Sequence, residues 1–147
     1  MPDVFDVAKY ILKKKGSMTT WKLQKLVYYC QAWSVVWDEE PIFDEPIEAW
    51  ANGPVVRALF NIHQGNFKIS SDDLPKGNPE ELDKKQKETI DAVIRDYGDY
   101  NSQYLSDLTH MESPWLEARG SIPEGLYSDS EIPLESMHRY YGSLSKE

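Results

Sequence analysis

The chain has 147 residues and a mass of 17.0 kDa, the size of one domain. It carries 25 acidic and 16 basic residues, a net charge of −9, and its 40% apolar content excludes a disordered chain. No stretch approaches the roughly 18 apolar residues of a membrane span. The single cysteine, Cys30, excludes an internal disulfide and every multi-cysteine zinc site. We expect one domain over residues 1–147, located in the cytoplasm, where a lone thiol stays reduced.

Helical periodicity predicts two helices at the start of the chain. The first covers residues 3–15, with Asp3 as its cap and Gly16 at its end. The second covers residues 20–37 and has apolar stripes on two nearly opposite sides, at about 100° per residue. The stripes are Leu23, Leu26, Val27, Cys30, Ser34 and Trp37 on one side, and Trp21, Tyr28, Ala32 and Val35 on the other. This helix is therefore either buried at the centre of the fold, or one face meets a partner or a second copy of the chain.

The rest of the chain predicts shorter elements. Residues 38–53 hold two apolar pieces around a proline turn, which indicates two short strands or a wing. Asn52-Gly53-Pro54 predicts the start of a helix over 54–64, because Asn caps and Pro fits the first helical position. A loop with a short strand at 67–69 follows, and then helices over 80–97, after Ser102, from Ser113, and after a cap at Ser130.

We therefore predict a mainly α fold. It is a single compact helical domain of about five to seven helices around a central aromatic-rich helix, with a small β-hairpin or wing.

Charge is distributed unevenly along the chain. Residues 1–37 contain six Lys and two Asp, a charge of +4, which leaves −13 for the remainder. An acidic body repels the phosphate backbone, so nucleic acid is a disfavoured partner. The alternative is a small basic face that contacts nucleic acid through Lys9, Lys13, Lys14 and Lys22. The simpler interpretation places Lys13, Lys14 and Lys15 at a helix C-terminus, where cations favour the helix dipole.

Catalytic motifs are absent from the sequence. His110 and Glu112 are two residues apart, about 200° around a helix, so their side chains point apart rather than toward a shared metal or proton. Cys30 lies mid-helix on an apolar stripe, where burial makes a thiol inert. There is no P-loop, dinucleotide fingerprint or nucleophile elbow. We expect no enzyme, no cofactor and no metal site, with a hydrolase or transferase using His110, Glu112 and Cys30 as the alternative.

Aromatic residues give the stronger signal. The chain has five Trp and nine Tyr, more than a small helical core requires. Trp and Tyr dominate the hot spots of protein interfaces, because they bring a large contact area with little rotamer entropy. An exposed subset of these rings would indicate protein binding.

Several motifs also resemble a known family. They are Val7-Ala8-Lys9-Tyr10-Ile11-Leu12, Leu23-Gln24-Lys25-Leu26-Val27-Tyr28-Tyr29-Cys30-Gln31-Ala32-Trp33, Ile47-Glu48-Ala49-Trp50, Asn52-Gly53-Pro54-Val55-Val56, His63-x-Gly65, Leu105-Ser106-x-Leu108-Thr109-His110-x-Glu112-x-Pro114-Trp115 and Tyr140-Tyr141. With these motifs in this order, residues 4–144 resemble the Panacea antitoxin domain family, long catalogued as a phage-associated domain of unknown function.

The resemblance implies a helical antitoxin of a two-gene toxin–antitoxin system, without an established cofactor, that neutralises a small toxin by direct contact. The partner would be the cognate toxin, encoded by the adjacent gene; routing of the toxin to a protease is an alternative to masking. No separate DNA-binding module is visible, and no catalytic residue is carried over. We expect the partner-binding surface to combine Trp21, Tyr28, Tyr29, Trp33, Trp50, Asn52, His110, Glu112 and Trp115.

Overall fold

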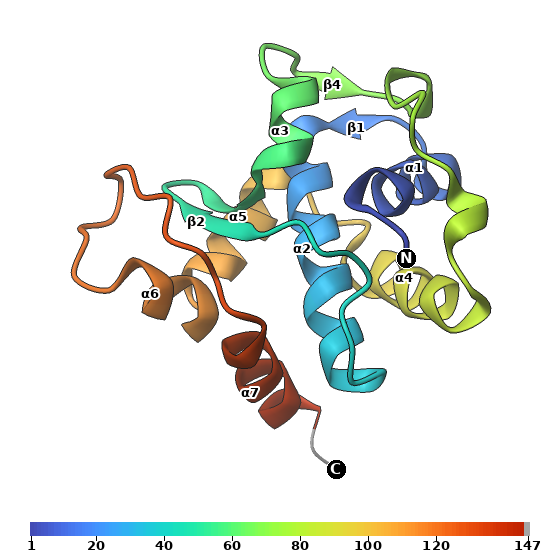
Figure 1. Ribbon diagram of the computed structural model, residues 1–147. Helices are drawn as coiled ribbons and strands as arrows, with labels where there is room; N and C mark the ends of the chain where they lie inside the picture. Colours follow the sequence, from blue (N-terminus) through green and yellow to red (C-terminus); the bar gives the residue numbers. More distant parts are fainter. Residues whose placement is uncertain (146–147) are drawn as a thin grey trace.

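Helix α2 (Thr20–Trp37) runs through the middle of the protein, and other elements pack around it (Figure 1). In this computed structural model, which describes residues 1–145, α2 is buried over most of its length. Its neighbours are α1 (Val4–Lys15), α4 (Lys84–Tyr97), α5 (Ser102–His110), α7 (Leu134–Leu144) and strand β3 (Gly53–Val56). Both predicted apolar stripes therefore face protein except at the ends of the helix, where Trp21 is half-buried and Trp37 is exposed.

The first two helices begin and end where the sequence predicts. Asp3 caps α1 in a reciprocal capping box with Asp6, and Gly16 ends it with a φ of 96°. The Thr19 side chain accepts a hydrogen bond from the Lys22 N–H at the start of α2. These local contacts satisfy backbone groups that the helix itself leaves unpaired.

Two short antiparallel sheets flank the helices. Strand β1 (Met18–Thr19) pairs with β4 (Lys68–Ile69), and β2 (Ile47–Trp50) forms a hairpin with β3. The prediction that Asn52-Gly53-Pro54 starts a helix is wrong. Gly53 instead pairs with Trp50 across the two-residue turn Ala51-Asn52, and α3 (Arg57–His63) begins only after β3. Gly53 has a φ of 122°, a conformation that glycine readily adopts.

The segment after α6 (Ser113–Arg119) completes the hairpin sheet. The Ala49 N–H donates to the Ser130 carbonyl, and the Ile132 N–H donates to the Ile47 carbonyl. The prediction that Ser130 caps the last helix is therefore wrong, since its backbone pairs with the hairpin and α7 begins at Leu134. Helix α4 also begins later than predicted, at Lys84, after two short 3-10 turns over Ser71–Asp73 and Pro79–Glu81.

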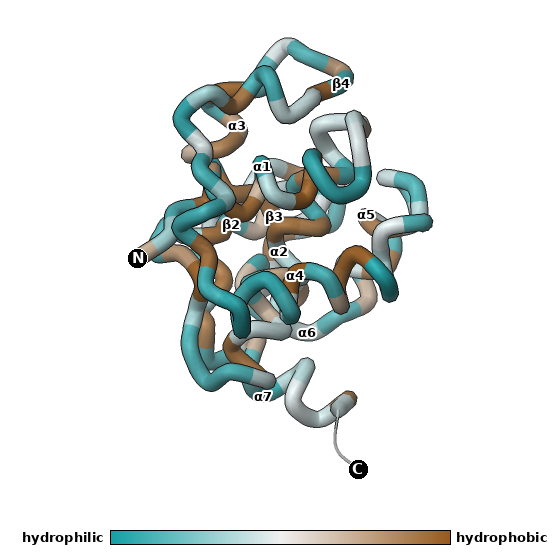
Figure 2. The backbone as a smooth tube through the Cα atoms, turned by 90° about the vertical axis from the view of Figure 1, so that its right-hand side faces the viewer, coloured by the Kyte–Doolittle hydropathy of each residue, from teal (hydrophilic) through white to brown (hydrophobic). Residues whose placement is uncertain are grey.

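The fold class is as predicted. Residues 1–145 form a mainly helical compact domain with seven α-helices, two small antiparallel sheets and a buried aromatic cluster centred on α2. Figure 2 shows hydrophobic stretches on the inner elements and hydrophilic residues along the outer loops. Within the described residues, no helix is both long and apolar enough to cross a membrane.

Candidate functional site

The nine residues expected to form a partner-binding surface divide between the core and the surface. Five side chains are buried: Tyr28, Tyr29, Trp33, Glu112 and Trp115. Trp21, Trp50 and His110 are half-buried, and Asn52 is exposed. These five side chains pack in the core and offer no contact area to a partner in this conformation. The accessible part of the expected surface therefore lies around the β2–β3 turn.

Glu112 anchors a buried cluster of tyrosine hydroxyls. Tyr29 Oη and Tyr141 Oη donate to Glu112 Oε1 at 2.8 and 2.7 Å, and the Tyr28 and Tyr141 hydroxyls lie 3.0 Å apart. Burial raises the pKa of Glu112, while the two tyrosine hydrogen bonds favour its charged form and oppose that rise. This network joins α2, α7 and the start of α6, so its role is to hold three helices together.

His110 contacts the turn of the β2–β3 hairpin. Its Nε2 lies 2.9 Å from the Ala51 carbonyl oxygen, and its Nδ1 contacts the Ser106 carbonyl oxygen. The ring packs against Trp115 at a centroid distance of 4.1 Å, and Trp115 Nε1 donates to the Trp50 carbonyl. Backbone carbonyl partners at both ring nitrogens give His110 a structural role in this conformation.

His110, Glu112 and Cys30 do not form a shared site. Cys30 is fully buried, and burial raises the pKa of its thiol. Among residues 1–145, the hydrogen bonds of His110 go to backbone carbonyls and those of Glu112 come from tyrosines, so no bond joins any two of the three. The same part of the chain holds no cluster of three or more His, Cys, Asp or Glu side chains suited to a metal ion.

Four aromatic side chains gather on the outside of the hairpin, and we call Trp21, Trp50, Phe60 and Tyr127 the hairpin aromatic cluster. The ring centroid of Trp50 lies 4.8 Å from that of Phe60, 6.4 Å from that of Tyr127 and 6.5 Å from that of Trp21. Three of the rings are half-buried, and Tyr127 is 65% exposed. Sequence analysis missed Phe60 and Tyr127, because only the fold brings α3 and the 120–129 loop to the hairpin.

Arg57 makes polar and cation–π contacts with two members of this cluster. Its guanidinium lies 5.0 Å from the centre of the Trp50 ring, a cation–π distance. It also donates to Glu48 Oε1 at 2.9 Å and to Tyr127 Oη at 3.1 Å. The cluster therefore combines aromatic area with a held arginine, the residue types that are enriched in interface hot spots.

Lys25 is the residue whose position the sequence analysis missed most clearly. It belongs to the +4 segment of the chain, yet its side chain is only 1% exposed. Its Nζ lies 5.2 Å from the Trp21 ring centre, and burial lowers its pKa to about 7. The available signal was its place in a helix with apolar stripes on two sides, which leaves little solvent-facing surface for a lysine.

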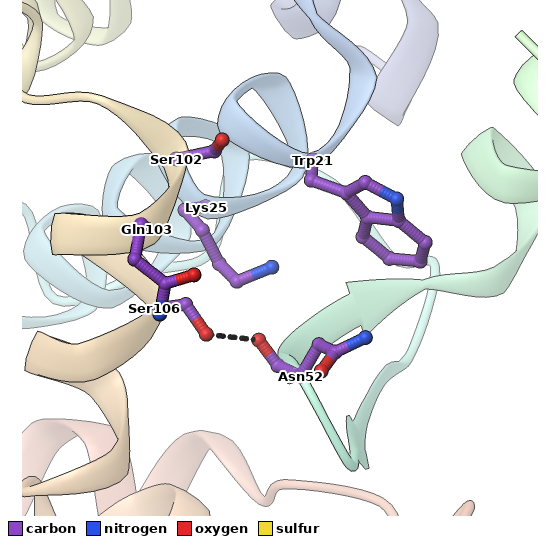
Figure 3. A pocket seen from close by; sticks show the side chains of 6 residues that line it. All are labelled: Trp21, Lys25, Asn52, Ser102, Gln103 and Ser106. Atoms are coloured by element: carbon purple, nitrogen blue, oxygen red, sulfur yellow. Dashed lines mark hydrogen bonds between the residues drawn. The ribbon is translucent and has the colours of Figure 1, made fainter. Parts of the chain in front are cut away.

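The ammonium of Lys25 points into a cavity of about 230 Å³ (Figure 3). The lining residues are Trp21, Lys25, Asn52, Ser102, Gln103 and Ser106, and Ser106 Oγ donates to the Asn52 carbonyl at 2.7 Å. A neighbouring cavity shares Asn52, Gln103 and Ser106 and extends to His110. The lysine cavity thus opens next to the hairpin aromatic cluster, with Trp21 common to both.

The basic residues of α1 follow the simpler interpretation of the charge pattern. Lys13, Lys14 and Lys15 are exposed in its last turn, where they favour the helix dipole. Lys15 Nζ lies 2.6 Å from Asp99 Oδ1, and Lys14 Nζ lies 3.9 Å from Asp91 Oδ1. Acidic partners therefore offset part of this basic face.

Comparison with known proteins gives one positive result. The family model described as "Antitoxin SocA-like, Panacea domain" matches residues 23–116, which run from α2 to the first turns of α6. No curated protein matches the chain, and no solved structure matches it. The matched segment holds α2, the hairpin and the His110–Trp115 contacts, and it spans more than half of the sequence. The chain therefore belongs to the SocA-like antitoxin family with a Panacea domain.

Proposed function

We propose that this protein neutralises a cognate toxin by direct protein–protein contact, and that the hairpin aromatic cluster is the centre of the interface. Membership of the SocA-like antitoxin family implies a toxin partner. The observation that carries the choice of surface is the gathering of Trp21, Trp50, Phe60 and Tyr127 around Arg57. Half-buried rings in fixed positions lose little rotamer entropy when a partner covers them.

The surface around the cluster provides additional apolar contact area, and the protein provides a net charge that favours association. Exposed apolar side chains continue outward at Leu126 and Met111, at 57% and 70% exposure. A stable complex requires about 1,000 Å² or more of buried surface, and the loop over 120–129 extends the available area. The net charge of −9 favours fast capture of a basic toxin.

Masking of the toxin at this surface would act without any bond being made or broken. We place the partner's gene next to that of this chain and the complex in the cytoplasm. Delivery of the bound toxin to a protease would use the same contact, and the amount of toxin in the cell separates the two. Masking leaves the toxin level unchanged, while delivery lowers it.

The test uses the full chain and the product of the neighbouring gene. Expression of that product alone should arrest growth, and co-expression of this chain should restore growth and co-purify with it. Trp50→Ala should weaken binding by about 30-fold or more, since hot-spot truncations cost roughly 2 kcal/mol or more. Trp37→Ala is the matched control, because Trp37 is 43% exposed at the far end of α2.

Equal effects of the two substitutions would reject the hairpin aromatic cluster as the interface. Absence of binding and of growth rescue by the unaltered chain would reject direct neutralisation of that gene product. Circular dichroism and thermal unfolding of each variant establish that the fold is retained.

A further inference from the structure

Lys25 is a buried amine without an anionic partner. Within residues 1–145, no carboxylate lies within salt-bridge distance of its Nζ, and its side chain makes no hydrogen bond. None of the six residues that line its cavity is acidic. A buried charge is costly unless it is paired, so this arrangement favours an anion that enters from outside.

The cavity contains further groups suited to an anion. Ser102 and Gln103 are the first two residues of α5, and the N-terminal end of a helix carries partial positive charge. In the described part of the chain, the Ser102 hydroxyl and the Asn52 side-chain amide have no hydrogen-bond partner, so both remain available as donors. Trp21 provides one apolar wall (Figure 3).

Size and charge select among anions. The volume of about 230 Å³ accommodates a short acidic side chain or a small organic acid. Lys25 is the one cationic side chain among the lining residues, so it balances one negative charge better than the two of a phosphate group. The Trp21 ring suits the methylene groups that precede a carboxylate.

We propose that the Lys25 cavity is a binding site for a carboxylate group, paired with the Lys25 ammonium and hydrogen-bonded by Ser102 and Asn52. This site adjoins the hairpin aromatic cluster through Trp21, but carboxylate binding does not depend on the proposed toxin contact. The carboxylate has two sources of the same chemistry, a free small acid and an acidic side chain of the bound toxin.

The site can be tested on the full chain, without knowledge of the toxin. Lysine labelled with ¹³C at Cε reports the Lys25 ammonium directly by NMR. Propionate serves as the free small acid, N-acetylglutamate α-amide as the protein side chain, and N-acetylglutamine amide as the uncharged control. Both acids should shift the Lys25 signal in a saturable manner, at equal ionic strength held with chloride, and the amide should not.

Protonation supplies a second readout. A bound carboxylate stabilises the ammonium, so saturating propionate should raise the pKa of Lys25 from about 7 toward its ordinary value. Propionate affinity should be about tenfold higher at pH 6 than at pH 8, because only the charged amine binds. His63 is the titratable neighbour on α3, and its pKa is lowered mainly by burial and to a smaller extent by the Lys25 charge, so its ring signals are followed in the same samples.

Substitutions on one helix provide the control. Lys25→Met retains a long apolar side chain in the core and should abolish the response to both acids. Lys22→Met, at a half-buried position in the first turn of α2, should leave the Lys25 response intact. A Lys25 signal that does not respond to either acid, or an unchanged response of the remaining signals in Lys25→Met, would overturn the proposal.

Binding experiments with the toxin distinguish the two sources of the carboxylate. If the toxin supplies it, propionate should compete with the toxin, and Lys25→Met should weaken the complex by tenfold or more. If a free acid is the ligand, Lys25→Met binds the toxin normally and still loses propionate. Either result supports the site, whereas failure of toxin binding by the unaltered chain concerns only the proposed function.

Discussion

Gly53 leaves the space that Lys25 occupies: a Cβ atom at position 53 would lie 2.5 Å from Lys25 Cε and 3.0 Å from Thr109 Oγ1. The turn of the hairpin, the centre of α2 and the end of α5 therefore meet at a point where only glycine fits. The shape of the lysine cavity depends on this residue as much as on the lysine itself.

Gly53→Ala should lower the free energy of unfolding by about 2–4 kcal/mol, measured by urea denaturation. Two causes add, because alanine is strained at a φ of 122° and its methyl group would collide with Lys25. Gly125→Ala is the control for the first cause, since Gly125 has a φ of 92° with no atom within 4 Å of a Cβ. Equal losses in the two variants would contradict the steric argument. In a Lys25→Ala background, part of the cost of Gly53→Ala should disappear.

Lys25→Met should change how stability depends on pH. The pKa of Lys25 is about 7 in the folded chain and 10.5 as the ordinary value, so the unfolded chain binds more protons between these limits. The wild-type free energy of unfolding should therefore rise from pH 7 to pH 9 relative to Lys25→Met, by about 2 kcal/mol. Urea denaturation at the two pH values measures this difference. Lys13→Met, at an exposed position of α1, is the control. Parallel pH profiles for wild type and Lys25→Met would show that burial does not perturb this amine.

Tyr29→Phe should destabilise the protein by about 1–3 kcal/mol. The substitution removes a hydroxyl that donates to the buried carboxylate of Glu112 at 2.8 Å and leaves that charge less well satisfied. Thermal or urea unfolding measures the loss. Tyr104→Phe is the matched control, because Tyr104 is 49% exposed, and its change should stay within about 0.5 kcal/mol. A neutral Tyr29→Phe would mean that Tyr141 alone supports Glu112.

Gln31→Met should loosen the segment before the hairpin. Gln31 Oε1 accepts from the Ile42 N–H at 2.8 Å, and its Nε2 donates to the Phe43 carbonyl at 2.7 Å. Methionine leaves both buried backbone groups unpaired, which costs about 1–3 kcal/mol. Amide hydrogen exchange should show faster exchange at Ile42, with no change in Gln64→Met, whose side chain is exposed. Retained protection at Ile42 would indicate that another acceptor replaces the glutamine.

Much of the fold follows from local sequence signals. The periodicity of α1 and α2, the Asp3 cap and the end of α1 at Gly16 are short-range effects, and the structure has them where predicted. Asn52-Gly53-Pro54 shows the limit of such reasoning. The same residues suit a helix start and a hairpin, and pairing of Gly53 with Trp50 decided between them. Ser130 failed for a similar reason, because its carbonyl pairs with Ala49, far away in the chain.

The site was less accessible to sequence analysis than the fold. The aromatic content indicated protein binding, but it did not say which rings would be buried. Tyr29 and Trp21 lie on the same helix, yet Tyr29 is fully buried and Trp21 is half-buried. Burial of Lys25 depends on the arrival of Gly53 and α5 at one side of α2. The spacing of residues along the sequence does not predict such a contact between distant segments.

The family match begins within α2 and stops within α6, yet α1 and α7 both pack against that central helix. The Ile132 N–H, which lies outside the matched range, also donates a hydrogen bond to the Ile47 carbonyl. A fragment trimmed to the matched residues would lose Tyr141 and Met137 from the interior and expose apolar rows that water would then have to solvate. The recognisable signature of the family is therefore smaller than the unit that folds, and an expression fragment for this protein needs both flanks.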